Sequence, residues 1–274
     1  MLTGLNLAST RSNLRSGRTI TGDTRPEAMS SVASQVVLHP TVSHSLKVLS
    51  TTLGRDKTYR AVQYFSRFFA WLLITRGYKI QAARWNALKS HLALGRKLMR
   101  LGKPVENLQA LLRAIQTPGD AGERITMIGR QLGYFAYLSF DAIVWANSIK
   151  FITLKPSTSQ KVNKLTNQFW FSGLVFSIAH SLLKAGRLAN ETKALQSNQT
   201  WTDKGLEAER EVKLHHLQVA RDSVRHQFVI DLLDVWIPAT NIGLVNLNDG
   251  VLGILGHCHH ICQGLPPSVE SSQR

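Results

Sequence analysis

Acidic residues are scarce in this chain. Its 274 residues include 17 aspartates and glutamates against 33 lysines and arginines, and the formal net charge is +16 at pH 7. A chain of this charge attracts partners that carry phosphate, such as lipid headgroups or nucleic acid. We therefore expect an anionic partner.

Cysteine is also rare, since the chain contains only Cys258 and Cys262. The two lie too close together in the sequence to link distant parts of a fold, as the disulfides of small secreted proteins do. This usage indicates a reducing compartment.

Motifs of catalysis and cofactor binding are missing from the sequence. It has no Gly-x-Ser-x-Gly, no phosphate-binding loop and no His-Glu-x-x-His, and no nucleic-acid-binding motif is recognisable. Near the C-terminus, thiol and imidazole groups suitable for zinc occur at His257, Cys258, His259, His260 and Cys262. They are too crowded for two ligand pairs separated by a loop. The sequence predicts no enzyme, no cofactor, no metal site and no nucleic-acid partner.

Long apolar runs are absent, although three windows carry little charge. Residues 131–149 contain only Asp141, residues 165–183 contain no charged residue, and residues 235–256 contain only Asp249. Each window approaches the ~20 residues of a spanning helix, but an aspartate near the bilayer centre would cost about 2.5–3.5 kcal/mol. Two interpretations stay open: buried helices of a soluble bundle, or marginal hydrophobic helices that span or half-insert into a membrane.

The apolar residues that are present recur three and four positions apart, which is typical of helices. We expect helices at 42–53, 56–82, 84–102, 105–116, 122–154, 160–198, 203–236 and 240–256. The predicted fold class is all-α, a membrane-associated protein of amphipathic and marginally hydrophobic helices.

The expected domain organisation has three parts. Residues 1–38 form a basic tail, residues 39–256 a helical domain and residues 257–274 an irregular tail. The first 28 residues are rich in arginine, serine and threonine and contain no acid before Asp23, like a mitochondrial transit peptide. A disordered tail, or an over-extended start with Met29 as the initiator, is the favoured alternative.

A basic amphipathic helix is expected at 84–103. Its predicted apolar face comprises Trp85, Leu88, Leu92, Leu98 and Met99, and its predicted basic face, on the opposite arc, comprises Lys89, Arg96, Lys97, Arg100 and Lys103. No acid occurs from Gln81 to Lys103. Such helices lie in the membrane interface, where each cation near an anionic leaflet contributes about 1 kcal/mol. Ordinary packing against a core and nucleic-acid binding are the alternatives.

A family resemblance is carried by several motifs in order: His39-Pro40-Thr41-Val42-Ser43, Gly54-Arg55-Asp56-Lys57, Gln63-Tyr64-Phe65-Ser66-Arg67-Phe68, the run from Arg96 to Lys103, the run from Asp141 to Trp145, and Asp231-Leu232-Leu233-Asp234. Together they resemble the fungal peroxin-11 proteins, the elongation factors of the peroxisomal membrane. The likeness extends from about His39 to Gly256. One departure follows Gly256, where the family's final apolar segment tends to continue but this chain turns polar.

The resemblance implies a function at the peroxisomal membrane. It implies that the basic helix inserts into the cytosolic leaflet of an anionic phospholipid membrane, that the protein forms homo-oligomers, and that it cooperates with the fission adaptor and the dynamin-related GTPase. Two other functions stay open. One is a solute channel in which Asp141 and His180 line a polar path, and the other is a soluble helical binding module.

Overall fold

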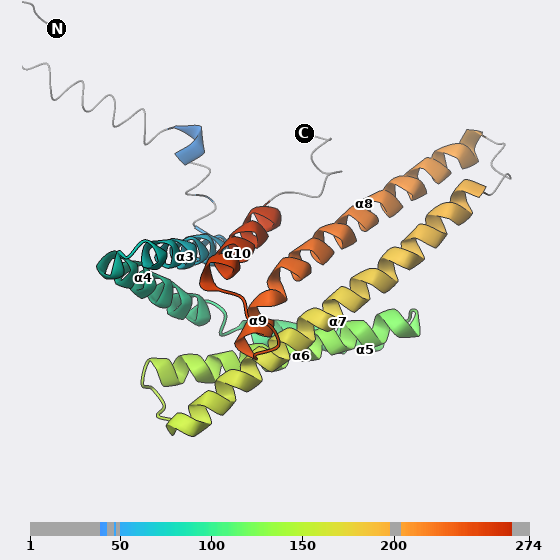
Figure 1. Cartoon of the computed structure of the whole chain (residues 1–274). Helices are drawn as coiled ribbons and strands as arrows, with labels where there is room; N and C mark the ends of the chain where they lie inside the picture. Colours follow the sequence, from blue (N-terminus) through green and yellow to red (C-terminus); the bar gives the residue numbers. More distant parts are fainter. Residues whose placement is uncertain (1–38, 43–46, 48–49, 198–203, 265–274) are drawn as a thin grey trace, which may run out of the picture. The chain divides into compact units, whose positions relative to one another are not determined.

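The structure, a computed structural model, describes residues 39–42, 47, 50–197 and 204–264. The chain divides into two compact units, 1–48 and 49–274. In the first unit, residues 40–42 form a helical turn. The second contains the labelled helices of Figure 1: α3 (Thr52–Thr75), α4 (Lys79–Leu98), α5 (Lys103–Gln116), α6 (Ala121–Ser148), α7 (Pro156–Ser197), α8 (Lys204–Asp234), α9 (Trp236–Asn241) and α10 (Asp249–Gly264). The described residues contain no strand, so the all-α prediction is confirmed.

The ends of these helices have local causes. Thr51 caps α3 by accepting a hydrogen bond from the Gly54 amide at 3.0 Å, and the side chain of Asp120 caps α6 in the same way. Gly77, at φ +84°, separates α3 from α4, because only glycine adopts this conformation without strain. The predicted boundary at 82–84 is therefore wrong. The predicted break at 54–55 is also wrong, because these residues lie inside α3. Of the predicted helix 42–53, residues 43–46 and 48–49 lie outside the described residues.

The C-terminal boundaries also differ from the prediction. The helix expected at 240–256 is two separate elements, since α9 ends at Asn241 and α10 begins at Asp249. Residues 257–264, expected to be irregular, continue α10. This extension is held by His259, which is 2% exposed and whose Nδ1 lies 3.3 Å from the Ile230 carbonyl. The predicted tails at 1–38 and 265–274 lie outside the described residues.

Aromatic residues of α3 pack closely against glycines of α10. Gly250, Gly253 and Gly256 recur every three residues, and a Cβ atom at each would lie less than 3 Å from Trp71, Phe68 or Tyr64 respectively. Leu252, on the same helix, forms a buried cluster with Tyr64 and Ile237 of α9. The small residues let the two helices pack at a separation that larger side chains would prevent.

A second close crossing joins α6 to α7. A Cβ atom on Gly133 would lie 2.7 Å from the Cα of Gly173. Aromatic pairs flank this point: Tyr137 stacks on Trp170 with ring centroids 5.3 Å apart, and Phe140 stacks on Phe169 at 5.5 Å. This crossing fixes Tyr137 and the next turn of α6 beside the site described below.

The three low-charge windows differ in secondary structure. Residues 131–149 lie almost entirely in α6 and residues 165–183 in α7, whereas residues 235–256 are divided between α9, a turn and α10. Within the described parts of the chain, no helix has the length and apolar character needed to cross a membrane.

Candidate functional site

Arg96 is buried where α4 packs on α3. The residue is 7% exposed. Its Nε donates to Oδ1 of Asp56 at 2.9 Å and its Nη1 donates to Oε1 of Gln63 at 2.8 Å, both on α3. A buried charge is tolerated when it is paired and hydrogen-bonded in this way. Arg96 therefore links two helices in this structure.

Trp85 lies on the same side of α4 as Arg96, because a separation of eleven positions makes about three helical turns. The indole packs edge-on against Phe65 and Phe69 of α3. Lys89, one turn beyond Trp85, places its Nζ 3.6 Å from Oδ2 of Asp249. The predicted separation into opposite apolar and basic arcs is therefore wrong for Lys89 and Arg96, which share a side with Trp85.

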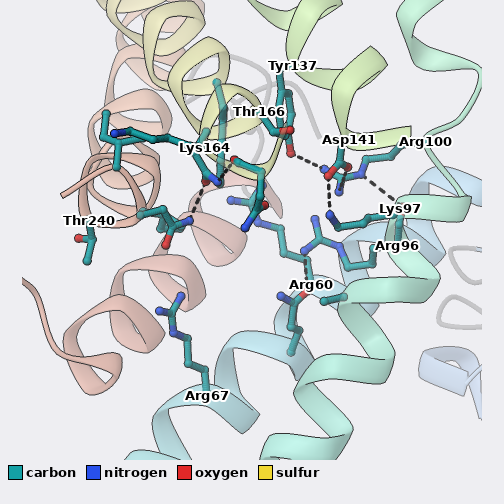
Figure 2. Close-up of a pocket in the computed structure, with 18 of the residues that line it drawn as sticks. Arg60, Arg67, Arg96, Lys97, Arg100, Tyr137, Asp141, Lys164, Thr166 and Thr240 are labelled. Atoms are coloured by element: carbon teal, nitrogen blue, oxygen red, sulfur yellow. Dashed lines mark hydrogen bonds and ion pairs between the residues drawn. The ribbon is translucent and has the colours of Figure 1, made fainter. Parts of the chain in front are cut away.

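Lys97, in the last turn of α4, and Arg100, just after this helix, direct two cations at one carboxylate of α6. Nζ of Lys97 lies 2.7 Å from Oδ1 of Asp141, and Nη2 of Arg100 lies 3.1 Å from Oδ2. Arg100 also donates through Nη1 to the Tyr137 hydroxyl at 3.0 Å. Figure 2 shows these side chains converging, with Asp141 between the two cations. The aspartate that seemed costly in a bilayer is thus neutralised inside the protein.

The remaining predicted site residues differ in exposure. Leu88 and Leu98 are 39% and 53% exposed, whereas Leu92, Met99 and Lys103 are half-buried. The structure therefore does not gather the ten predicted residues on a single free surface. Lipid binding by these residues stays a prediction.

A cavity of about 710 Å³ lies between α3, α4, α6, α7 and α9. It is called the basic pocket here and is drawn in Figure 2. Its cationic lining residues are Arg60, Arg67, Arg96, Lys97, Arg100 and Lys164. Among the described residues that line it, Asp141 is the one carboxylate. Neutral polar groups, including Thr166 and Asn167, complete much of the lining. The pocket offers far more hydrogen-bond donors than anionic acceptors.

The guanidinium groups of the basic pocket repel one another. Burial, together with the positive charges of Arg60 and Arg100, lowers the pKa of Arg96 below its ordinary value. Nη2 of Arg60 is paired with Asp234, but its Nε is buried without a hydrogen-bond partner. One guanidinium donor at the base of the pocket therefore has no acceptor in the described part of the protein.

An apolar surface follows α4 in the chain. On α5, Val105, Leu108, Leu112 and Ile115 are 60%, 39%, 52% and 53% exposed. Their spacing of three and four residues places them on one side of the helix, and they are called the α5 stripe here. No residue of α5 is buried. The sequence predicted this helix but did not single out its apolar side, although the spacing is visible in the sequence.

The channel hypothesis required Asp141 and His180 to line one path. Asp141 lines the basic pocket, and His180 is not among the residues that line it. Nδ1 of His180 instead lies 3.1 Å from the Glu123 carbonyl, near the start of α6. The structure does not bring the two residues together.

Comparison with known proteins identifies the family. The model of the family described as peroxisomal biogenesis factor 11 (PEX11) matches residues 42–259. The chain belongs to this family. Its peroxisomal membrane localisation and its role in peroxisome proliferation, both predicted from the motifs, are thereby confirmed.

The curated relatives of this family member cover most of its length. It is 28% identical to peroxisomal membrane protein PMP30B of Candida boidinii, over 82% of this chain and 93% of the relative. It is 26% identical to PMP27 of Saccharomyces cerevisiae over the same shares, and 25% identical to human peroxisomal membrane protein 11A, over 75% of this chain and 87% of the relative. These names describe peroxisomal membrane proteins. No solved structure matches the chain.

Proposed function

We propose that this protein elongates the peroxisomal membrane before fission by inserting apolar side chains of its α4–α5 region into the cytosolic leaflet and by self-association. The observation that carries the proposal is the exposed α5 stripe on a protein of the peroxisomal membrane. A wedge in one leaflet expands that leaflet and bends the bilayer. The mechanism requires no catalysis.

The energetics favour the α5 stripe as the first point of contact. Full burial of a large aliphatic side chain contributes about 1.5–3 kcal/mol. The four residues of the stripe already hide roughly half of their surface, so lipid burial of the remainder would contribute about 3–6 kcal/mol in total. Leu88 and Leu98, also exposed, would add to this without any rearrangement.

Insertion of the predicted α4 faces has a larger cost. Lys97 and Arg100 could meet lipid phosphates only after leaving Asp141, and Arg96 only after leaving Asp56. Separating a buried carboxylate from its partners costs about 3–5 kcal/mol. We therefore propose that the cations of α4, together with Trp85, bind lipid in a second step, after the stripe has anchored the protein.

Self-association and recruitment of the fission machinery complete the proposal. Val175, Phe176 and Leu182 of α7 are large apolar residues exposed at 44%, 37% and 58%, and they could pack against a second copy. Resemblance to the peroxin-11 proteins supports the fission adaptor and the dynamin-related GTPase as further partners.

Tubulation of anionic vesicles by the purified full chain tests the wedge. Leu108→Asp with Leu112→Asp places charge on the α5 stripe, whereas the control Gln109→Asp alters an exposed residue of the same helix outside the stripe. We expect the double variant to lose tubulation and the control to keep it. Undiminished tubulation by the double variant would overturn the proposal.

A further inference from the structure

Insertion of the α5 stripe does not use the basic pocket, and the pocket concentrates charge. Six cations line it, and four aspartates form ion pairs with five of them: Asp56, Asp141, Asp234 and Asp249. Six positive charges therefore face four negative charges, an excess of two. Asp249 is also shared with Lys89, outside the lining. The ion pairs within the protein do not balance the pocket.

Groups without a partner among the described residues lie at both ends of the cavity. At the base, Arg60 has a buried Nε without a hydrogen-bond partner. At the rim, Lys164 of α7 is exposed and forms no ion pair with a described residue. Figure 2 places Lys164 across the pocket from Lys97 and Arg100. A ligand in the cavity would meet cations from two sides.

The walls of the pocket are suited to a polar ligand of moderate size. Its volume of about 710 Å³ is in the range of small-molecule sites, about 300–1,000 Å³. Thr166, Asn167 and Asn241 supply neutral hydrogen-bonding groups. Lining residues at the base, such as Arg96 and Tyr137, are buried, while Gln160 and Asn163 at the rim are exposed. A ligand can therefore enter from the rim and reach desolvated guanidinium groups.

We propose that the basic pocket binds a phosphate ester that carries more than one negative charge. Guanidinium groups suit phosphate because their planar donors match its oxygens, and charge-assisted hydrogen bonds are the stronger kind. Two negative charges would balance the excess of two. Burial and the neighbouring charges of Arg60 and Arg100 lower the pKa of Arg96, and the same ligand would reduce the repulsive part.

The phosphate could belong to a lipid headgroup or to a soluble molecule. In either case the ligand occupies a pocket and not the bilayer interior, so this proposal does not depend on the wedge. The α5 stripe is outside the pocket lining, so charges placed on the stripe leave the pocket unchanged, and Lys164→Ala and Asn163→Glu leave the stripe unchanged.

Binding to the full chain in detergent micelles tests the proposal by calorimetry, with pyrophosphate and an inositol bisphosphate as soluble probes. Lys164→Ala removes a rim cation, and Lys161→Ala is its control, an exposed lysine of the same helix outside the lining. Asn163→Glu places an anion at the rim, and Gln168→Glu is its control on the exposed surface of α7.

We expect at least one probe to bind, Lys164→Ala to weaken binding about fivefold, and Asn163→Glu to weaken it more than about tenfold. Both controls should stay within about twofold of the unmodified chain. All these variants change exposed side chains, and circular dichroism verifies their folding. Failure of both probes to bind, or equal losses in the variants and their controls, would overturn the proposal.

Vesicles distinguish the two sources of the phosphate. If the ligand is a lipid headgroup, phosphatidylcholine vesicles containing a phosphoinositide will retain more protein than plain ones, and Asn163→Glu will abolish the difference. If the ligand is soluble, the probes will bind in solution. Vesicles with and without the phosphoinositide will then retain the same amount of protein, or Asn163→Glu will leave any difference unchanged. Leu108→Asp with Leu112→Asp should leave probe binding intact, even if it abolishes tubulation.

Discussion

Nζ of Lys97 lies 2.7 Å from Oδ1 of Asp141, and this ion pair turns part of the basic side of α4 toward the protein. Arg100 binds the second oxygen of the same carboxylate. Cations of α4, a helix without acidic residues, are thus paired with carboxylates on other helices. The resulting contacts join α4 to α6 and form one wall of the basic pocket.

Removal of the Asp141 carboxylate should destabilise the protein. Asp141→Ala leaves Lys97 and Arg100 close together without their shared counter-ion, and we expect a loss of about 3 kcal/mol in the free energy of unfolding. Denaturant unfolding followed by circular dichroism measures it. The control Glu191→Gln breaks an exposed pair with Arg187 and should cost less than about 1 kcal/mol. Equal losses in the two variants would show that the ion pairs of Asp141 stabilise the protein no more than an exposed pair does.

The glycines of α10 give a second stability prediction. A Cβ atom at Gly253 would lie 2.7 Å from the backbone nitrogen of Phe68, so α10 must shift away from α3 in Gly253→Ala. We expect a loss of about 1–3 kcal/mol. Gly186→Ala, on α7, is the matched control because nothing lies within 4 Å of its new Cβ. There alanine should raise the free energy of unfolding by about 0.5–1 kcal/mol. If Gly253→Ala also raised the free energy of unfolding, the tight α3–α10 contact would be contradicted.

His259 should make stability depend on pH. Burial lowers its pKa to about 4, with Arg60 acting in the same direction against Asp234. An unfolded histidine binds a proton near pH 6.5, so between about pH 4 and pH 6.5 the unfolded chain holds more protons and stability falls as pH falls. This contribution is about 2 kcal/mol between pH 6.5 and about pH 5.

The variant His259→Gln isolates that contribution. Thermal unfolding of the unmodified chain should lose stability from pH 6.5 to pH 5 more steeply than unfolding of His259→Gln. The control His216→Gln changes an exposed histidine of α8 and should keep the steep dependence. Identical slopes in the unmodified chain and His259→Gln would contradict the assignment.

Much of the fold follows from local patterns in the sequence. Apolar spacing predicted the all-α class and placed α5 at 105–116, close to its observed bounds of Lys103–Gln116. The separation of the helices expected at 84–102, 105–116 and 122–154 also agrees with the structure, where α5 begins at Lys103 and α6 at Ala121. The break at Gly77 was missed because a single glycine inside a periodic pattern does not reveal its φ.

The site could be predicted only in part, because its partners are distant in the chain. Asp56 is 40 residues from Arg96, and Asp141 is 41 residues from Arg100. A window from Gln81 to Lys103 shows the cations without the acids that bind them. The lining of the basic pocket comes from five helices, so no local sequence motif predicts the pocket.

The depth of the α5 stripe in a bilayer tests the central claim most directly. Cys258 and Cys262 are free and would first be replaced by serine. An environment-sensitive dye is then attached at Leu112→Cys on the stripe or at Arg113→Cys, an exposed position beside it. On anionic vesicles we predict a blue shift and quenching by acyl-chain quenchers for the dye at 112, and neither for the dye at 113. A dye at 112 that stays in water while the protein tubulates the vesicles would contradict insertion of the stripe.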